Sequence, residues 1–264
     1  MRNGADLRMS PAFGIRLAPK KDMNVGLRAD LHIHTREAEP FITYDARQVI
    51  ARAAKDGYRV LSISNHDTVT FDQDLAAFAR DHGIVLIPGV EVTVEGRHVL
   101  VYNADVAVDK LRTFAGLKRY RTPEWLVVAP HPFFPAPYCL REKLWQQIEL
   151  FDAVEFSHFY TPRVDFNRAA VKLARAVGLP LIGTSDSHID AQFGTTFSLI
   201  ESAASVEAVV SAIKAGQISV VSRPLSLTRC ASILAQHALG AGRVRARSWL
   251  RPNPPSPQTI LTPR

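Results

Sequence analysis

The sequence contains very little cysteine, and this scarcity excludes two kinds of structural module. Of its 264 residues only two are cysteines, Cys139 and Cys230, which lie far apart and form no CxxC pair. Zinc ribbons and disulfide frameworks need closely spaced cysteines, so neither is predicted. We therefore expect cysteine to play no part in the chemistry. Any metal site must be built from histidine, aspartate and glutamate.

Long hydrophobic runs are also missing. No segment approaches the roughly 18 uninterrupted apolar residues that indicate a transmembrane helix. The first segment, Met1 to Leu27, is polar and basic and lacks the apolar centre of a signal peptide. These two absences predict a cytoplasmic protein with no membrane partner.

Charge of one sign dominates, since the formal net charge is +7. Much of the excess lies at the two ends, within residues 2–21 and 243–264. A basic surface favours anionic partners, so a small phosphorylated substrate, a nucleotide or nucleic acid is compatible with it. Basic termini are also common as solvated tails. Arginine and proline dominate after Arg243, and we expect Arg251–Arg264 to be disordered.

Apolar runs alternate with amphipathic stretches along most of the chain. This order of strand and helix, repeated about six or seven times, predicts an α/β fold with a parallel sheet that is either open or closed into a barrel. The predicted strands are Leu27–Ile33, Arg59–Ser64, Ile84–Ile87, Leu126–Ala129, Ala153–Phe156 and Leu179–Gly183.

Several helices and one hairpin have clear local signals. The pattern of Asp45–Asp56 ends at Gly57, and that of Leu75–His82 ends at Gly83, where a C-terminal glycine is expected. Thr161-Pro162 is typical of a helix start, and that helix is predicted to end near Gly178. A last helix is predicted at Leu227–Leu239. A hairpin is predicted from Val90–Val94 and His98–Tyr102, with its turn at Glu95-Gly96.

Histidine, aspartate and glutamate recur at or beside the ends of the predicted strands. His32 and His34 are two apart, so on a strand they point to the same face. The carboxyl ends of parallel strands lie on one side of a sheet, where function collects in βα folds. The six segments are Asp30–His34, Ser64–Asp67, Gly89–Val92, Ala129–Pro132, Val154–His158 and Gly183–His188. Together they predict one polar site.

The residue types of this site indicate its chemistry. Imidazole and carboxylate together suit zinc, manganese or iron. One ion needs three or four protein ligands, whereas this chain offers about nine candidates. The surplus predicts a site for two or three divalent ions. Paired ions roughly 3.5–4 Å apart bind phosphoryl oxygens and generate hydroxide at neutral pH, which predicts hydrolysis of a phosphate ester.

The same segments, in this order, resemble the PHP domain of the polymerase and histidinol phosphatase superfamily. The matching motifs are DLHIHT, SNHDT, GVEV, APHP, the segment around His158, and GTSDSH. They cover residues 28–188, with a family-like remainder to about Val221. The resemblance implies a distorted (β/α)7-type barrel over residues 27–222. Residues 1–26 would then be a basic extension, and residues 223–264 a C-terminal helix with a Pro-rich tail.

The resemblance also implies three sets of metal ligands. The first metal would be held by His32, His34, Glu91 and Asp186. Glu91 would bridge to a second metal held by His131 and His158. The third would be held by His66, His188 and a residue of the loop after His34. The family usually has Asp or His at that loop position, where this chain has Glu39; Glu37 is an alternative.

Other polar residues have two readings each. His98 is predicted to act as an acid or contact phosphate, and an ordinary structural histidine fits as well. Asp67 and Glu155 are expected to orient metal-bound histidines or to cap turns, and Asn65, where Asp is frequent, to sit behind the ligands. Arg36, Arg163 and Arg168 either grip phosphate or are simply exposed. His82 and His237 are interpreted as structural.

The predicted function is thus metal-dependent phosphoesterase activity on a phosphomonoester, a nucleotide or an oligonucleotide end, with Glu91, Asp186 and His98 as catalytic residues. A nuclease with the same site is an alternative, although no aromatic-rich basic stripe is evident. A noncatalytic metal-binding domain is another. An amidohydrolase with a carbamylated lysine is disfavoured because no lysine follows a strand. The sequence leaves the oligomeric state open.

Overall fold

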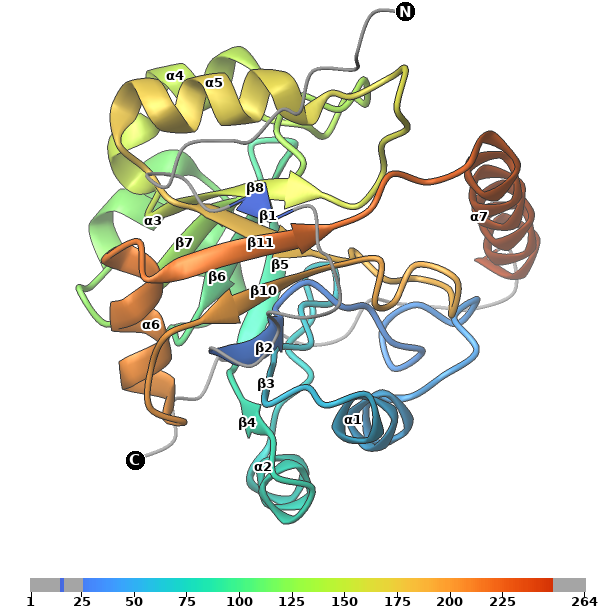
Figure 1. Cartoon of the computed structure of the whole chain (residues 1–264), viewed down its shortest axis with the longest axis horizontal. Helices are drawn as coiled ribbons and strands as arrows, with labels where there is room; N and C mark the ends of the chain where they lie inside the picture. Colours follow the sequence, from blue (N-terminus) through green and yellow to red (C-terminus); the bar gives the residue numbers. More distant parts are fainter. Residues whose placement is uncertain (1–14, 17–25, 249–264) are drawn as a thin grey trace, which may run out of the picture.

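The computed structural model describes residues 15–16 and 26–248, and for 15–16, 237–238 and 240–248 it describes the backbone alone. The predicted disorder of Arg251–Arg264 and the side chain of His237 lie outside the described residues. The described part is a mixed α/β structure with two sheets and helices on their outer faces (Figure 1). No helix within it combines the length and apolar character needed to cross a membrane.

The first sheet has six strands in the order β1-β11-β10-β2-β3-β4. Its pairs β2–β3 and β3–β4 are parallel, whereas β10 is antiparallel to both β2 and β11. The short strand β1 pairs with β11 and lies within the segment predicted as an extension. The strands are β1 (Ile15–Arg16), β2 (Leu27–Asp30), β3 (Val60–Leu61), β4 (Val85–Leu86), β10 (Thr196–Ile200) and β11 (Ile218–Ser222).

The second sheet has five strands in the order β5-β6-β7-β8-β9. The hairpin of β5 and β6 is confirmed, with Glu95 and Gly96 both at positive φ in its turn. Only β7, β8 and β9 run parallel. The strands are β5 (Gly89–Val94), β6 (Arg97–Tyr102), β7 (Leu126–Ala129), β8 (Ala153–Ser157) and β9 (Leu181–Thr184).

The two sheets do not join into a closed barrel, so the prediction of a (β/α)7-type barrel holds only as a mixed α/β fold. They approach each other at isolated bridges, Ile33 with Ser187 and His66 with Glu91. Between β9 and β10, the Ser198 side chain binds both the N–H and the C=O of Gly183. These backbone groups are therefore satisfied by a hydroxyl and not by a neighbouring strand, which leaves the sheet open there.

The helices cover the outer faces of the two sheets (Figure 1). Helices α1 and α2 pack on the six-stranded sheet, whereas α3 and α5 lie on the five-stranded sheet. Helix α7 stands at the side of the molecule and is longer than predicted. The helices are α1 (Ala46–Lys55), α2 (Gln73–Asp81), α3 (Phe114–Tyr120), α4 (Glu142–Gln146), α5 (Asn167–Val177), α6 (Val206–Lys214) and α7 (Leu227–Ser248), with 3-10 turns at Val108–Leu111 and Ile148–Leu150.

Local signals explain most helix ends. Helix α1 starts at a capping box formed by Asp45 and Gln48, as its pattern predicted. The predicted helix start at Thr161-Pro162 is wrong. The Thr161 hydroxyl accepts bonds from the N–H groups of Arg163 and Val164, which closes a turn. Helix α5 therefore begins later, at Asn167, and ends before Gly178 in the left-handed conformation.

One core cluster joins the two sheets and fixes where the polar site lies. It combines buried residues of both sheets, such as Ala29 and Leu100, with Val209 and Ile213 of α6. Helix α6 follows Ile200, which lies opposite Leu27 at the start of β2. The histidines that follow the other end of β2 therefore lie at the end of the core away from α6.

Gly183 of β9 packs closely against Val220 and Phe197, and a substitution there tests this packing. A Cβ there would lie 2.7 Å from Val220 Cγ1 and 2.8 Å from the carbonyl oxygen of Phe197. Gly183→Ala is expected to lower the free energy of unfolding by about 1–3 kcal/mol, the usual cost of overpacking. Urea unfolding measures this. Ser211→Ala, at an exposed site on α6, is the control, and an unchanged midpoint for Gly183→Ala would contradict the packing described here.

Candidate metal centre

Glu91 lies at the centre of the polar site. It is the third residue of β5, is almost fully buried, and its backbone is bonded to Ser64 and Asp67 in the segment that follows β3. Its Oε1 lies 2.9 Å from His98 Nδ1 and 3.2 Å from His131 Nε2. Its other oxygen, Oε2, faces a different group of histidines. One carboxylate therefore contacts two sets of imidazoles.

The first of these sets comes from the chain that continues β2. His32 and His34 are both fully buried, and their Nε2 atoms lie 3.2 Å and 3.4 Å from Glu91 Oε2. Asp186 Oδ1, which follows β9, lies 3.4 Å and 3.3 Å from the same two nitrogens. The structure thus brings together the four residues predicted to hold the first metal.

A second cluster contains the residues predicted for the third metal. Ligand atoms of His34, Glu39, His66 and His188 all lie within 4.8 Å of one another. Glu39 is 2.7 Å from His34 Nδ1, 3.8 Å from His66 Nε2 and 3.4 Å from His188 Nε2. His66 Nδ1 in turn lies 3.0 Å from Glu91 Oε2, so the two clusters adjoin.

The residues predicted for the second metal are brought together only in part. His131 contacts Glu91 and groups with His32 and Asp186. His158 is buried, but its Nε2 lies 3.2 Å from Gln192 Nε2, and it belongs to none of the clusters found among the described residues. His98 takes a place beside Glu91 and His66 instead. The ligand role of His158 stays a prediction.

Buried groups behind the cluster fix the orientation of two imidazoles. Glu155 Oε1 lies 2.8 Å from His32 Nδ1, and Glu155 Oε2 accepts the N–H of His131. The sulfur of Cys139, fully buried, lies 3.4 Å from His131 Nδ1. The spacing of the cysteines in the sequence predicts no part for them, and only this contact in space reveals one. With Nδ1 engaged, each imidazole turns Nε2 toward the cluster.

The alternative ligand and three candidate phosphate contacts have other partners. Glu37 Oε1 accepts a bond from the N–H of Ala46 at the start of α1, 2.9 Å away, so its carboxylate caps this helix. Arg36 pairs with Asp45. Arg163 and Arg168 are exposed, and Arg168 lies 3.9 Å from Asp165.

The structure also shows the contacts of Asp67, Asn65 and His82, whose roles the sequence left open or predicted to be indirect. Asp67 binds the N–H and hydroxyl of Thr93 and pairs with Arg112, so it fixes a turn, and none of these partners is a clustered histidine. Asn65 holds the loop after His34 through the N–H and hydroxyl of Thr35. His82 ends α2, with Nδ1 2.8 Å from the carbonyl oxygen of Phe78, which confirms a structural role.

Two of the clustered residues have an unusual backbone. His131 has φ of 28° and Asp186 has φ of 45°, both in the left-handed region that non-glycine residues seldom occupy. Such conformations cost free energy and are found mostly where function requires a side chain in one direction. The strain at both positions favours a functional cluster over a purely structural one.

The pKa values show an excess of carboxylate charge facing the imidazoles. Burial lowers the pKa of His32, but Asp186, Glu91 and Glu155 together raise it to about 10. Burial raises the pKa of Glu39, yet His34 and His188 outweigh it and bring the value to about 2. The pKa of Glu91 is likewise held well below its usual range, against burial, by His66 and His32. The site therefore demands positive charge, from protons or from cations.

The donor set fits divalent metal ions. Several buried ligand atoms lie close to one another but have no partner in hydrogen-bond geometry within the described part of the chain: His34 Nδ1 and Nε2, Glu39 Oε1, His66 Nδ1, His98 Nδ1 and Asp186 Oδ1. Buried polar atoms normally have hydrogen-bond partners. A cluster of buried ligand atoms without such partners therefore points to a bound ion. Imidazole nitrogens with carboxylate oxygens suit zinc, manganese and iron.

Proton release on metal binding follows from these pKa values. At pH 8 His32 carries a proton because its pKa is about 10, whereas a metal ligand must be neutral imidazole. Binding is therefore expected to release about one proton or more, and affinity to fall as the pH is lowered. Calorimetric titration of metal-free protein in two buffers of different ionisation enthalpy measures the number. Equal enthalpies in both buffers would contradict the assignment.

Comparison with known proteins finds similarity over parts of the chain. A family model described as PHP-associated matches residues 165–218. An uncharacterized protein of Methanocaldococcus jannaschii is 25% identical over 142 residues, which are 48% of this chain and 82% of that protein. A PolC-type DNA polymerase III of Staphylococcus epidermidis is 29% identical over 85 residues, which are 32% of this chain but only 6% of the polymerase.

A solved structure shares the fold. It is a two-domain protein of Bacteroides vulgatus that contains a predicted PHP-like metal-dependent phosphoesterase, with a TM-score of 0.60 and 17% identity over 83% of this chain and 70% of that one. The matched PHP-associated region and this shared fold agree with the resemblance of the sequence motifs to the PHP domain.

Proposed function

We propose that this protein is a metal-dependent phosphoesterase that hydrolyses a phosphate ester. The observation that carries the proposal is the position of Glu91, whose two oxygens face two different groups of histidines within one buried cluster. A carboxylate in this position suits a bridge between two ions. Divalent ions held in this way supply a nucleophile at neutral pH and neutralise charge on the phosphate.

The side chains of the cluster have separate tasks in this proposal. His32, His34 and Asp186 direct two Nε2 atoms and one carboxylate oxygen to the centre, where they would bind an ion. Glu155 fixes the orientation of the His32 imidazole. His98 is partly exposed and contacts Glu91, so it can hold a proton next to a bound phosphate. Holding these groups in one rigid arrangement contributes to catalysis because no reorganisation is needed at the reaction step.

Metal analysis and a substrate panel test the proposal. Protein purified without chelator is expected to contain more than one equivalent of zinc, manganese or iron, and a chelator is expected to abolish hydrolysis. The panel compares phosphate monoesters, diesters and short oligonucleotides on the metal-loaded protein. Metal-loaded protein that leaves every ester intact would overturn the assignment of hydrolysis, and protein without metal would overturn the assignment of the site.

A second candidate function is action on nucleic acid at the same site. It is favoured by the match to part of a DNA polymerase and by the net charge of +7. Binding through phosphate contacts falls steeply as salt rises. Oligonucleotide cleavage that drops with salt much more than hydrolysis of a small monoester would support this candidate, and equal salt dependence would exclude it.

A further inference from the structure

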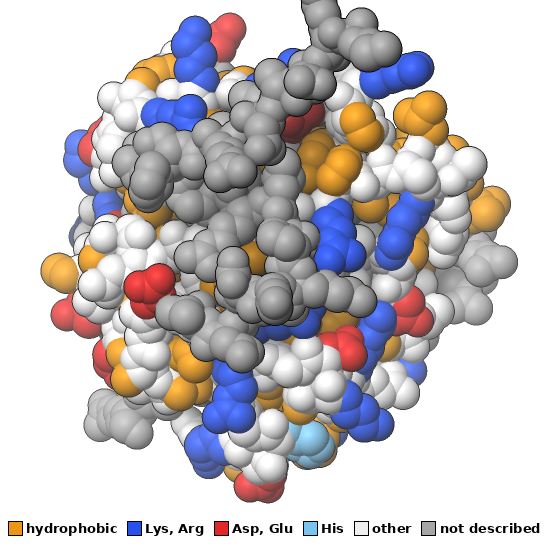
Figure 2. All heavy atoms as spheres, in the orientation of Figure 1, with side chains coloured by type: hydrophobic (Ala, Val, Ile, Leu, Met, Phe, Trp, Pro, Cys, Tyr) orange, Lys and Arg blue, Asp and Glu red, His pale blue; other side chains and the backbone are white. Residues whose placement is uncertain are grey.

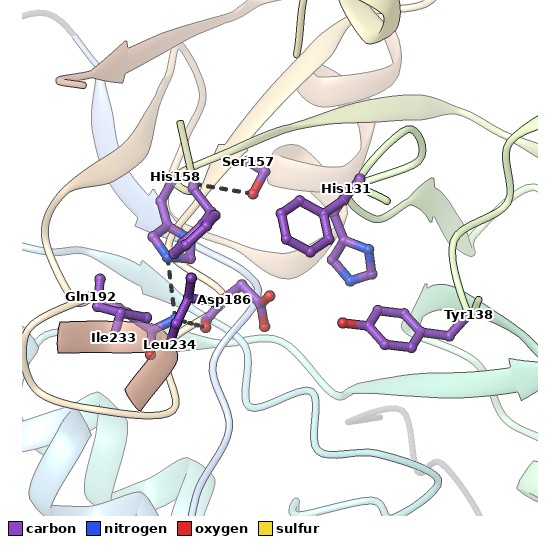
Figure 3. A pocket seen from close by; sticks show the side chains of 10 residues that line it. His131, Tyr138, Ser157, His158, Asp186, Gln192, Ile233 and Leu234 are labelled. Atoms are coloured by element: carbon purple, nitrogen blue, oxygen red, sulfur yellow. Dashed lines mark hydrogen bonds between the residues drawn. The ribbon is translucent and has the colours of Figure 1, made fainter. Parts of the chain in front are cut away.

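A partly open pocket lies against the metal centre. Its volume is about 170 Å³, and it is bounded by His131 and Asp186 on the side of the cluster (Figure 3). Tyr138 and Asp186 point toward each other across its interior, whereas Ile233 and Leu234 of α7 lie beside His158 and Gln192. A group bound here would be in direct reach of a phosphate held by the cluster.

The walls of the pocket are largely aromatic and aliphatic. Phe134 packs edge-on against Phe159 with ring centroids 5.6 Å apart. Tyr138 stacks on His98 at 4.5 Å and meets His131 edge-on at 5.7 Å. Among the described residues that line the pocket there is no lysine or arginine. An uncharged apolar group is therefore favoured over a second phosphate or a carboxylate.

The pocket is held in shape by backbone bonds. Phe134 donates its N–H to the carbonyl oxygen of His131, and Tyr138 accepts a bond from the N–H of His98 on β6. On the opposite side, Leu225 before α7 donates to Tyr160, and Arg229 of α7 binds the carbonyl oxygen of Ala191. Both walls are thus attached to the loops that carry the site, which makes the pocket pre-formed.

The volume limits the size of the group. A cavity of about 150 Å³ lined by apolar side chains holds one benzene ring. The pocket at about 170 Å³ therefore accommodates one six-membered ring, and anything larger would extend into solvent. Aromatic rings pack favourably edge-to-face on other rings, as Phe134 and Phe159 already do.

We propose that this pocket binds the organic part of the substrate, and that this part is a single uncharged aromatic ring attached near the phosphate. This inference rests on the proposed phosphoesterase function and names its substrate class. Phe134, Tyr138 and Phe159 contact the ring, and Ile233 and Leu234 of α7 close the pocket on the other side.

Two matched pairs of compounds test the proposal on the metal-loaded full chain. Benzyl phosphate and ethyl phosphate both release a primary alcohol, so they differ mainly in the ring. One methylene in an apolar pocket changes specificity about 10–200-fold, so kcat/KM is expected to favour benzyl phosphate by about 10-fold or more. Benzylphosphonate is expected to bind more tightly than ethylphosphonate by a similar factor, measured by calorimetry without any hydrolysis.

Variants locate the preference in this pocket. Phe134→Ala is expected to reduce both preferences by about 10-fold, with Phe134→Leu as a milder change and with metal content measured for each. Trp145→Ala is the control, because Trp145 is 52% exposed on α4 and does not line the pocket. Preferences that survive in both Phe134 variants would overturn the assignment of the pocket.

The outcomes separate this inference from the proposed function. Hydrolysis of both esters at equal rates, with equal phosphonate affinities, would overturn the pocket proposal and leave phosphoesterase activity standing. If neither ester is hydrolysed, the substrate panel decides whether the proposed function stands, and the affinities of the two phosphonates decide whether the pocket proposal stands. Tighter binding of benzylphosphonate supports the pocket, and equal binding overturns it.

Discussion

Glu91→Gln is expected to lower metal content and activity more than any other single carboxylate change in this protein. Glu91 contacts His32, His34 and His66 through one oxygen, and His98 and His131 through the other. The amide keeps the size of the side chain but removes its charge and replaces one acceptor oxygen with a donor. Loss of a residue behind the ligands typically costs about 10–100-fold, so loss of the bridge should exceed about 100-fold.

Glu37→Gln is the matched control for this change. Glu37 accepts the N–H of Ala46, and the amide oxygen of glutamine can accept the same bond. His98→Gln is a second comparison, because His98 contacts Glu91 through one oxygen, Oε1. Metal analysis and kcat/KM measured on all three variants test the prediction. Equal and mild losses at the three positions would show that Glu91 is not the bridge.

Local sequence patterns were sufficient to predict the centre of the site. The spacing of His32 and His34 places both imidazoles on one face, and the structure directs both Nε2 atoms at Glu91. The capping box of α1 and the turn at Glu95-Gly96 are equally local, and both are confirmed. In these cases the physical cause lies within a few residues of the feature, so a pattern can reveal it.

Features that depend on contacts distant in the sequence were missed. Cys139 approaches His131 only because the loop between them folds back, and nothing in the sequence marks that approach. Between β9 and β10 the Ser198 hydroxyl binds the backbone of Gly183 in place of a strand pairing, and no local pattern marks this contact. The late start of α5 depends on which of two local solutions Thr161 adopts, a turn or a helix cap. Contacts made on folding decide the first two of these cases, whereas the Thr161 turn is local and the sequence pattern fits both solutions.

Glu39→Ala is expected to remove one metal while the ions held around Glu91 remain. Glu39 alone of the two loop carboxylates reaches His34, His66 and His188, and the carboxylate keeps its charge because its pKa is about 2. Without it, two or three imidazoles remain and water fills the other coordination positions, so this ion should bind at least about 10–100-fold more weakly or be lost.

Glu37→Ala is the matched control for that variant, since Glu37 caps α1 at Ala46 and its loss should lower stability by about 0.5–2 kcal/mol without removing metal. Metal titration with a chromophoric chelator counts the ions that each variant retains. The cluster of His34, Glu39, His66 and His188 predicts one ion fewer in Glu39→Ala only. Loss of an ion in Glu37→Ala instead would show that the loop rearranges when metal binds. Full occupancy in both variants would mean that the site holds only the ions gathered around Glu91.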